Sequence, residues 1–475
     1  MFEREDEEEN LPEEEIQLSV ARFEEMIRTK SAFFFDELTF EHIIEYYLLQ
    51  NNQITAMTVV DYAIEQHPYV GTFLLKKAAL YFQLKKYELA EKWLRNAELL
   101  DPSDLGIYLL RADMLVISNQ HRKAVEVIEK ALTFAEKEEQ EDLFLELADV
   151  YEDWDRYEKV FESLKKCLLL NGNNEEALSR MWYTVELSKR YEESLLLHQN
   201  LIDENPYSYM AWHNLGHAYF DLGHYEKAIE AYEFVVAINE KCDLAYRDCG
   251  EAYFYMADYK KAIDQFLKAI EFSKPYEELN FSIAYCHEKL KQYSEARSFY
   301  KKAVATDQKY DEAYYRIGYT YKREKEWKNA LHFFKKAHKL NLENINYLMA
   351  LAEGYSVLQM PSEFSEVCAQ ILNLQPRHKK RSTYEKLTEF LIGFEFNAEA
   401  LSVIDIAIIE KGFIAKFPYL KFVALYNLGL QNEACQLLET ALQIVPAKYQ
   451  VIFKLLPALK TNERIIQIIE QHIKP

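Results

Sequence analysis

Two stretches of the chain are close to copies of each other. Residues 211–240 read AWHNLGHAYFDLGHYEKAIEAYEFVVAINE, and residues 245–274 read AYRDCGEAYFYMADYKKAIDQFLKAIEFSK. Corresponding letters lie 34 residues apart. A fixed period of this length is typical of proteins in which one supersecondary unit recurs along the chain. We therefore expect a single structural unit that is repeated many times.

The same register extends in both directions and gives twelve repeats between residues 37 and 448. The repeats begin at residues 37, 71, 105, 141, 175, 209, 243, 277, 311, 345, 381 and 415, with two additional residues before 141 and before 381. Alanine occupies position 20 in nine repeats, where ordinary alanine abundance would leave about one. Position 32 holds five of the prolines, namely Pro68, Pro102, Pro206, Pro376 and Pro446.

The spacing of apolar and small residues indicates that each repeat is a helix hairpin. In the sixth repeat the first helix carries an i, i+3, i+4, i+7 stripe made of Trp212, Leu215, Gly216 and Tyr219. A short turn at residues 221–224 separates it from a second stripe, made of Ala228, Tyr232 and Val235. This spacing is that of one helix face, and one hairpin alone cannot bury two such faces. Neighbouring hairpins must therefore stack into an all-α solenoid.

The pattern W-x-x-L-G-x-x-Y followed by A and Y resembles the tetratricopeptide repeat over nearly the whole chain. The resemblance implies a right-handed superhelix whose first helices line a concave groove for peptides or protein segments. Residues 1–11 are expected to be an acidic disordered tail, 12–36 an N-terminal capping helix, 37–448 the repeats, and 449–475 a degenerate capping hairpin. Three bulky residues depart from the pattern at small positions, namely Trp182, Phe364 and Phe422. The beginning of the chain also resembles long bacterial proteins of this family from Bacteroidetes.

The composition argues against an enzyme. No two of the 11 glycines lie closer than seven residues apart, which excludes G-x-G-x-x-G, the Walker loop and G-x-S-x-G. No Ser/His/Asp or Cys/His signature is present in the sequence either. We therefore expect a non-catalytic protein without a cofactor.

The net charge and the spacing of the cysteines indicate which partners and which cellular compartment to expect. Lys and Arg number 56 against 78 Asp and Glu, a net charge of −22, which repels nucleic acid and anionic membranes. The first fifteen residues hold nine acidic ones and lack the apolar core of a secretory signal. No apolar run approaches the ~18 residues that span a bilayer, and the six cysteines lack C-x-x-C spacing. The expectation is a cytoplasmic protein with reduced thiols, a protein or peptide partner, no nucleic acid and no membrane insertion.

In the resembled family, positions 2, 5, 6, 9, 12 and 13 of the first helix face the groove. In the fourth repeat these columns and their neighbours give an acidic stripe of Asp142, Glu146, Asp149 and Asp153, whose spacing places four carboxylates on one helix face. Such a stripe would receive Lys or Arg from a partner. A solvated acidic face would show the same pattern, and a loosely held Ca²⁺ is a third reading.

Further along the chain the same columns hold aromatic and basic residues, the types that carry most binding energy at interfaces. These groove candidates are Tyr183, His213, Asn214, His217, Phe220, Arg247, Phe254, Tyr255, Phe281, Tyr285, Tyr315, Arg316, Tyr319, Lys322 and Arg323. Arg316 and Arg323 could together hold a carboxylate. Alternatively, some of the aromatic side chains only cover neighbouring helices.

Two hypotheses follow for the function. The first is a non-catalytic scaffold that binds peptide or protein segments in its groove. The second is a regulatory or accessory protein that binds a small ligand or a metal through the acidic stripe, His213 and His217, because histidines four apart on a helix can ligate zinc. No metal site is predicted outright. The basic run RHKKR at residues 377–381 is expected to serve the C-terminus of the preceding helix.

Overall fold

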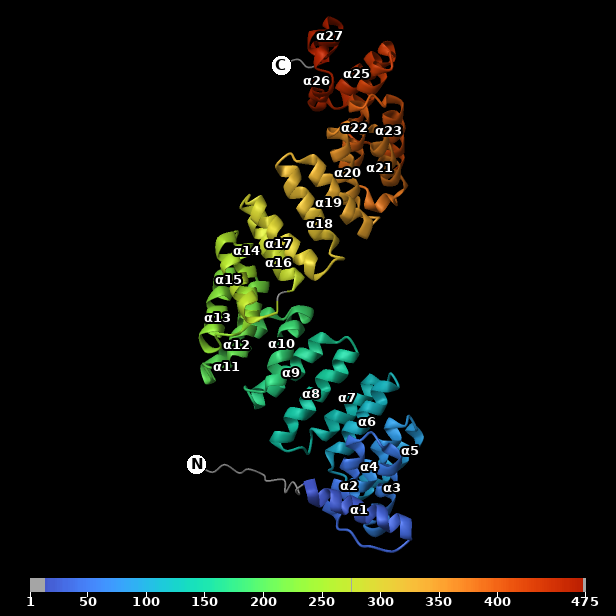
Figure 1. Ribbon diagram of the computed structural model, residues 1–475, viewed down its shortest axis with the longest axis vertical. Helices are drawn as coiled ribbons and strands as arrows, with labels where there is room; N and C mark the ends of the chain where they lie inside the picture. The colour runs from blue at the N-terminus through green and yellow to red at the C-terminus, as the bar shows by residue number, and fades with distance from the viewer. Residues whose placement is uncertain (1–12, 275, 473–475) are drawn as a thin grey trace. The chain divides into compact units, whose positions relative to one another are not determined.

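The computed structural model describes residues 13–274 and 276–472, and all regular elements within them are helical. The chain divides into two compact units, residues 1–240 and residues 241–475. In each unit the helices follow one another as hairpins that stack in chain order (Figure 1). The predicted all-α fold of stacked helix hairpins is therefore confirmed.

The first unit begins with one helix that is followed by six hairpins in the described residues. Its helices are α1 (Glu13–Thr29), α2 (Glu37–Leu49), α3 (Gln53–Gln66), α4 (Gly71–Gln83), α5 (Tyr87–Leu100), α6 (Leu105–Ile117), α7 (His121–Ala131), α8 (Lys137–Asp153), α9 (Tyr157–Leu170), α10 (Glu175–Ser188), α11 (Tyr191–Glu204), α12 (Tyr209–Asp221) and α13 (Tyr225–Ile238).

The second unit continues with six further hairpins and a short C-terminal segment. Its helices are α14 (Asp243–Tyr255), α15 (Tyr259–Phe272), α16 (Glu277–Lys289), α17 (Tyr293–Thr306), α18 (Asp311–Arg323), α19 (Trp327–Leu340), α20 (Ile345–Val357), α21 (Pro361–Asn373), α22 (Arg381–Gly393), α23 (Asn397–Lys411), α24 (Phe417–Asn427), α25 (Gln431–Ile444), α26 (Gln450–Leu455) and α27 (Glu463–His472). Short 3-10 turns occupy Pro376–His378, Pro446–Lys448 and Pro457–Thr461.

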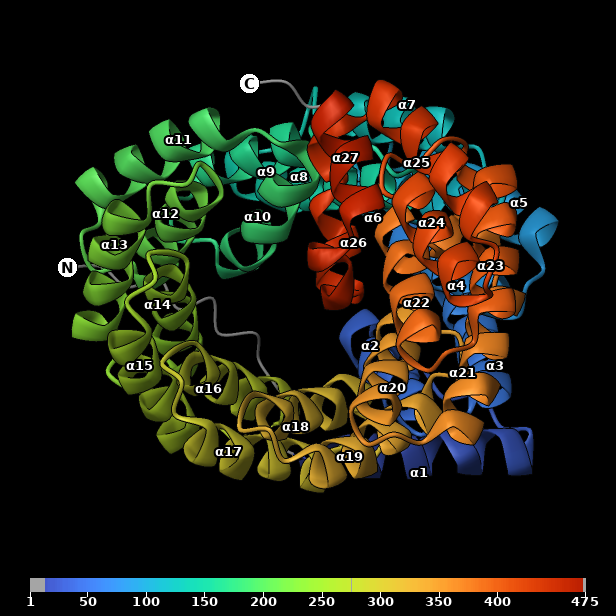
Figure 2. The same ribbon diagram turned by 90° about the horizontal axis from the view of Figure 1, so that it is seen from above.

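The first and second helices of the hairpins lie in separate rows. In the second unit α16, α18 and α20 form one row, and α17, α19 and α21 form the other (Figure 2). Side chains of the first row that point away from the second row therefore share one surface. We call this surface the first-helix face. The corresponding surface of the first unit is formed by α6, α8, α10 and α12.

Within a hairpin, a residue without a side chain meets a large ring. A Cβ atom added to Gly250 on α14 would lie 2.7 Å from Cδ1 of Phe266 on α15, and one added to Gly318 would lie 2.6 Å from Cδ1 of Phe334. Both rings are almost fully buried. In these two repeats position 8 is small because the ring at position 24 occupies the space beside it.

The turn inside each hairpin uses one left-handed residue at repeat position 15. All twelve residues in this column have positive φ, and only two of them are glycine: Asn51, Lys85, Asn119, Asp155, Lys189, Gly223, Ala257, Lys291, Lys325, Gln359, Glu395 and Gly429. A left-handed residue is the usual way to end a helix and reverse the chain. The turns are therefore numerous although glycine is scarce.

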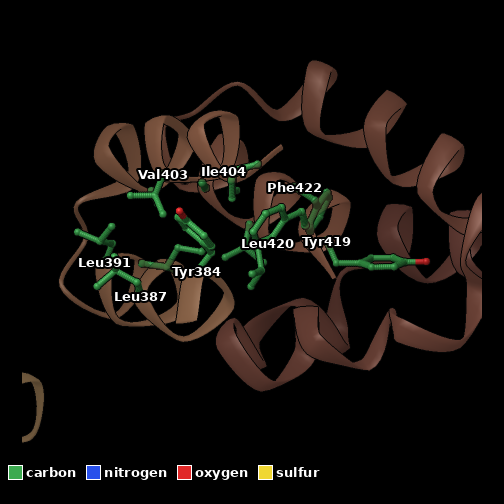
Figure 3. Close-up of a cluster of buried hydrophobic side chains, with 14 of the residues drawn as sticks. Tyr384, Leu387, Leu391, Val403, Ile404, Tyr419, Leu420 and Phe422 are labelled. Atoms are coloured by element: carbon green, nitrogen blue, oxygen red, sulfur yellow. The ribbon is translucent and has the colours of Figure 1, made fainter. Parts of the chain in front are cut away.

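Of the three bulky residues that depart from the repeat pattern, two are buried in the core. Phe364 is fully buried, with its ring centroid 4.9 Å from that of Phe394. Phe422 is also fully buried, in the cluster that includes Tyr384, Leu420 and Ile404 (Figure 3). Trp182 instead points outward, with 44% of its surface exposed. The repeat thus accepts a large residue either by repacking or by turning it to solvent.

Both ends of the repeat array carry additional helices. Helix α1 buries Val20, Phe23 and Met26 in the core that contains α2 and α3, and α27 buries three isoleucines beside α25. That these segments act as caps stays a prediction. The acidic tail predicted for residues 1–11 lies outside the described residues, as do Pro12 and residues 473–475.

The basic run at residues 377–381 serves helix ends, as the sequence suggested. Lys379 is 1% exposed, and its Nζ donates to the carbonyl oxygen of Leu372 in the last turn of α21 at 2.9 Å. The same Nζ pairs with Glu410 on α23 at 3.2 Å. Burial raises the pKa of Glu410, but bonds from Tyr384 and Lys379 outweigh it and hold the pKa below its ordinary value.

Gly250→Ala tests the small-to-ring contact. The new Cβ would overlap the buried ring of Phe266, so we expect the free energy of unfolding to fall by roughly 1 to 3 kcal/mol. Gly393→Ala is the matched control, because nothing lies within 4 Å of a Cβ added there. Chemical denaturation of both variants decides the matter. Equal stability of Gly250→Ala and wild type would contradict the packing described here.

Candidate functional site

The two units differ strongly in charge. Residues 1–240 contain 23 Lys and Arg against 49 Asp and Glu, a net charge of −26, whereas residues 241–475 contain 33 against 29, a net charge of +4. The negative excess of the chain therefore belongs to the first unit. The two first-helix faces must be considered separately.

On the first unit, carboxylates from three successive first helices interact. Glu146 on α8 has its pKa raised to about 7 by burial and then by the charges of Asp113, Asp149, Glu176 and Asp142. Asp113 belongs to α6 and Glu176 to α10, so the predicted stripe widens into an acidic face. Neither residue was singled out from the sequence, although both occupy groove columns of their repeats, positions 9 and 2.

One arginine neutralises part of this acidic face. The Nη2 atom of Arg180 on α10 lies 2.6 Å from Asp149 and 2.9 Å from Glu152, and its Nη1 lies 3.3 Å from Glu176. The Tyr183 hydroxyl donates to Glu152 at 3.1 Å. Asp142, Asp149 and Asp153 are exposed. The α6 side of the face therefore keeps more uncompensated negative charge than the α10 side.

Glu146→Gln tests this crowding through its pH dependence. The folded protein holds the Glu146 proton up to about pH 7, whereas the unfolded chain releases it near the ordinary value of 4.5. Stability therefore falls as the pH rises from 4.5 to 7, because the folded state must then accept the crowded charge. At pH 8 we expect the variant to be more stable than wild type by about 1 kcal/mol, after allowance for solvent screening.

Thermal unfolding at pH 5 and pH 8 measures the effect, which should nearly vanish at pH 5. Glu192→Gln, on the exposed surface of α11, removes the same charge away from the face and serves as control. A stabilisation of equal size at both pH values would rule out the raised pKa as its cause.

The candidate residues on α12 pack partly against other residues of the first unit. The imidazole rings of His213 and His217 are 4.6 Å apart, and both rings pack against Tyr232. Asn214 is buried and donates to the carbonyl oxygen of Leu178 at 2.9 Å. Asn214 therefore connects neighbouring repeats and is not available to a partner. Phe220 packs edge-on against Tyr225, with ring centroids 5.4 Å apart.

On the second unit, the predicted aromatic residues line a pocket of about 240 Å³ in the first-helix face. It lies between α14 and α16, over the ring of Phe266 on α15. Four candidates meet in its lining, together with three residues that were not among the candidates; the full set is Glu251, Phe254, Tyr255, Phe266, Phe281, Ser282 and Tyr285. Tyr255 stands at the solvent edge with 60% of its surface exposed. The rings of Phe254 and Tyr285 approach to 5.6 Å across the two helices.

A buried charged network supports one wall of this pocket. The guanidinium of Arg316 on α18 lies over the Tyr285 ring, 4.6 Å from its centroid. Its Nη1 lies 3.3 Å from Glu288, whose side chain is only 7% exposed. The Tyr300 hydroxyl donates to the other oxygen of Glu288 at 2.9 Å. Burial raises the pKa of Glu288, against the lowering effects of Arg316 and Tyr300.

The remaining basic candidates also have partners within the second unit. Arg247 pairs with the buried Asp248 at 2.8 Å, and Lys322 pairs with Glu353 at 2.6 Å. The Nε of exposed Arg323 donates to the Tyr293 hydroxyl at 3.3 Å. Tyr315 and Tyr319 pack against the core of the unit. A partner carboxylate would therefore have to displace acidic groups of the chain from Arg316.

Arg316→Ala tests whether Arg316 stabilises the fold through its contact with Glu288. The change leaves the Glu288 carboxylate buried without its cation, so we expect the free energy of unfolding to fall by about 2 to 3 kcal/mol. Arg323→Ala, at an exposed site on the same helix, should change it by less than about 0.5 kcal/mol. Urea denaturation compares the two. If adding Glu288→Gln to Arg316→Ala restores no stability, the stranded carboxylate is not the cause.

The comparisons with known proteins agree with the repeat register. Family models described as tetratricopeptide repeat match residues 72–104, 141–174, 209–242, 277–310 and 311–344. Each match begins within one residue of a repeat defined from the sequence. The chain therefore contains tetratricopeptide repeats at these five stretches. The narrower resemblance to bacterial proteins stays a prediction.

The solved structures to which the chain is similar are distant in sequence. The chain is 20% identical to YrrB, "a TPR protein with an unusual peptide-binding site", over 38% of this chain and 93% of that one, with a TM-score of 0.34. It is 19% identical to MamA from Desulfovibrio magneticus RS-1 over 36% and 97%, with a TM-score of 0.34. For the anaphase-promoting-complex hetero-tetramer Cut9–Hcn1 the values are 12%, 89% and 93%, with a TM-score of 0.36. No curated protein matches the sequence.

The length and the apolar character of the helices are relevant to a membrane crossing. Within residues 13–274 and 276–472, no helix combines the length and the apolar character that a bilayer crossing requires.

Proposed function

We propose that this protein is a non-catalytic scaffold that binds segments of partner proteins on its first-helix faces. The observation that carries the proposal is the aromatic pocket between α14 and α16, because rings open to solvent on a rigid pair of helices are typical anchors of protein interfaces. Tyr255 supplies the most exposed of these rings. The domain architecture and the groove columns of the family support the same proposal.

The acidic face of the first unit suggests a second contact on the same partner or on another one. Glu146 is crowded by neighbouring carboxylates, so a basic segment that docks there would relieve repulsion that the free protein bears. This electrostatic contribution would weaken with salt. The partner of this face is therefore expected to be rich in Lys or Arg.

We further propose that the scaffold works in a reducing compartment, the cytoplasm. All six cysteines lie in the described part of the chain and none of them forms a disulfide, and five of them are buried. Burial raises the pKa of Cys167 and Cys286 to about 12 and that of Cys368 to about 11. Thiols with such pKa values are unreactive at neutral pH and act as small apolar core residues.

The test is selection of binders from a displayed library of random 12-residue peptides with the full chain as bait. Among the selected peptides, those that bind the second unit should lose about tenfold or more in affinity with Tyr255→Leu, measured by fluorescence anisotropy. Tyr69→Leu is the matched control, since Tyr69 is another exposed tyrosine, 84% against 60% for Tyr255, far from the pocket in sequence.

Peptides that bind the first unit should weaken with Glu146→Gln and with added salt. Unchanged affinity of every selected peptide in both Tyr255→Leu and Glu146→Gln would place binding elsewhere, such as on the second helices, and would refute the proposal.

A further inference from the structure

Two second helices of the second unit, α17 and α19, carry an excess of positive charge. Together they contain seven Lys and Arg residues against a single carboxylate, Glu295. The second helix that follows them, α21, has Glu363 and Glu366 as its charged residues, and α25 has Glu433 and Glu439. The positive charge is therefore local to α17 and α19 and is not a general property of the second helices.

The lysines of these two helices follow the period of the repeat. Lys301 and Lys302 occupy positions 25 and 26 of the eighth repeat, and Lys335 and Lys336 occupy the same positions of the ninth. Helices α17 and α19 both pack on α18 and lie in one row (Figure 2), so equivalent positions on them point in similar directions. All four side chains are exposed. We call the surface that these four lysines form the basic second-helix face.

Aromatic rings lie beside three of the four ammonium groups. The Nζ of Lys302 is 4.2 Å from the centroid of the Phe299 ring, and the Nζ of Lys336 is 5.5 Å from that of Phe333. The Nζ of Lys335 is 5.4 Å from the centroid of a third ring, on α20. A ring attracts an ammonium group and packs against its methylene stem, but it does not neutralise the charge. The rings therefore help to position these cations and leave their charge available.

The chain itself supplies no carboxylate to these lysines. Within residues 13–274 and 276–472 none of the four forms an ion pair. Arg297, on the same helix α17, is by contrast paired with Glu324 at 2.6 Å. Glu295 lies seven residues before Lys302, about two helical turns away. The basic second-helix face is therefore uncompensated in the free protein.

A pocket of about 340 Å³ between α19 and α21 marks one border of this surface. Lys335 and Lys339 stand on its α19 side, and Glu363 and Glu366 stand on its α21 side. The sign of the charge thus changes across the pocket. A long polyanion such as nucleic acid would continue from α19 onto these carboxylates and be repelled by them. A short acidic segment can remain on α17 and α19.

We propose that the basic second-helix face docks a segment of a partner protein that is rich in Asp and Glu. Its uncompensated cations are complementary in charge to such a segment. Because rings already restrict three of the lysine side chains, these lose less conformational freedom when a carboxylate binds. The surface belongs to the other row of helices from the first-helix faces, so this proposal goes beyond the proposed function and can fail without it.

The experiment measures binding of a fluorescein-labelled peptide, EELAEELAEELA, to the full chain by fluorescence anisotropy at low salt. The uncharged counterpart is QQLAQQLAQQLA, which we expect to bind at least about tenfold more weakly. Replacement of all four lysines of the basic second-helix face by Gln should weaken binding of the Glu peptide at least about fivefold. The thermal melt of this variant should match wild type, because the four sites are exposed.

A matched control removes the same charge from other surfaces of the second unit. It replaces four exposed lysines by Gln, namely Lys325, Lys386, Lys448 and Lys460. Binding of the Glu peptide to this variant should change less than about twofold. Tyr255→Leu and Glu146→Gln should also leave it unchanged, so a failure of the proposed function would show only with the peptides selected for the first-helix faces.

Four results would overturn the proposal. Equal weakening in the control variant would indicate attraction to the overall charge, and equal binding of the Glu and Gln peptides would exclude charge recognition. Tighter binding of a 12-nucleotide oligothymidine than of the Glu peptide, lost in the variant of the basic second-helix face, would indicate a nucleic-acid site. Self-association of wild type in sedimentation velocity, absent in that variant, would identify the occupant as a second copy of the chain.

Discussion

Close packing of the two helices within each hairpin is the constraint on which the rest of the solenoid depends, and it is plainest between positions 8 and 24 of the seventh and ninth repeats. Gly250 and Gly318 leave room for the buried rings of Phe266 and Phe334, and the two helices of a hairpin can approach only because that room exists. Once the hairpin is closed, both of its helices expose an apolar stripe that a neighbour must cover. The packing inside the hairpin thus leaves two apolar stripes that only a stack of hairpins can cover.

The same constraint shapes the surface that we propose for binding. When second helices bury the rings at position 24, the first helices are left with their outer columns open to solvent. In the second unit the ring of Phe266 also forms the base of the aromatic pocket. One residue therefore contributes to hairpin packing and to the proposed binding surface, so substitutions at Phe266 would affect both together.

The net negative charge of the chain lies in the first unit, whereas the second unit is slightly positive. The first unit carries a large negative excess, and burial together with four carboxylates on its first-helix face raises the pKa of Glu146. In the second unit most basic groups on the corresponding face are already paired, as Arg316 and Lys322 are. An acidic face and an aromatic pocket are consequently suited to different parts of a partner or to different partners.

The sequence by itself determined the repeat, the hairpin and its register, because those depend on spacings within 34 residues. Helix periodicity, the small residue at position 8 and the proline at position 32 are all local signals. It also identified four of the seven pocket residues, because the groove columns repeat with the same period. Only the tertiary structure decided which column residues are accessible: Asn214 is buried by Leu178, and Arg316 is held by Glu288. These partners lie 36 and 28 residues away, in the neighbouring repeat, and such contacts depend on the side chains that two repeats happen to bring together.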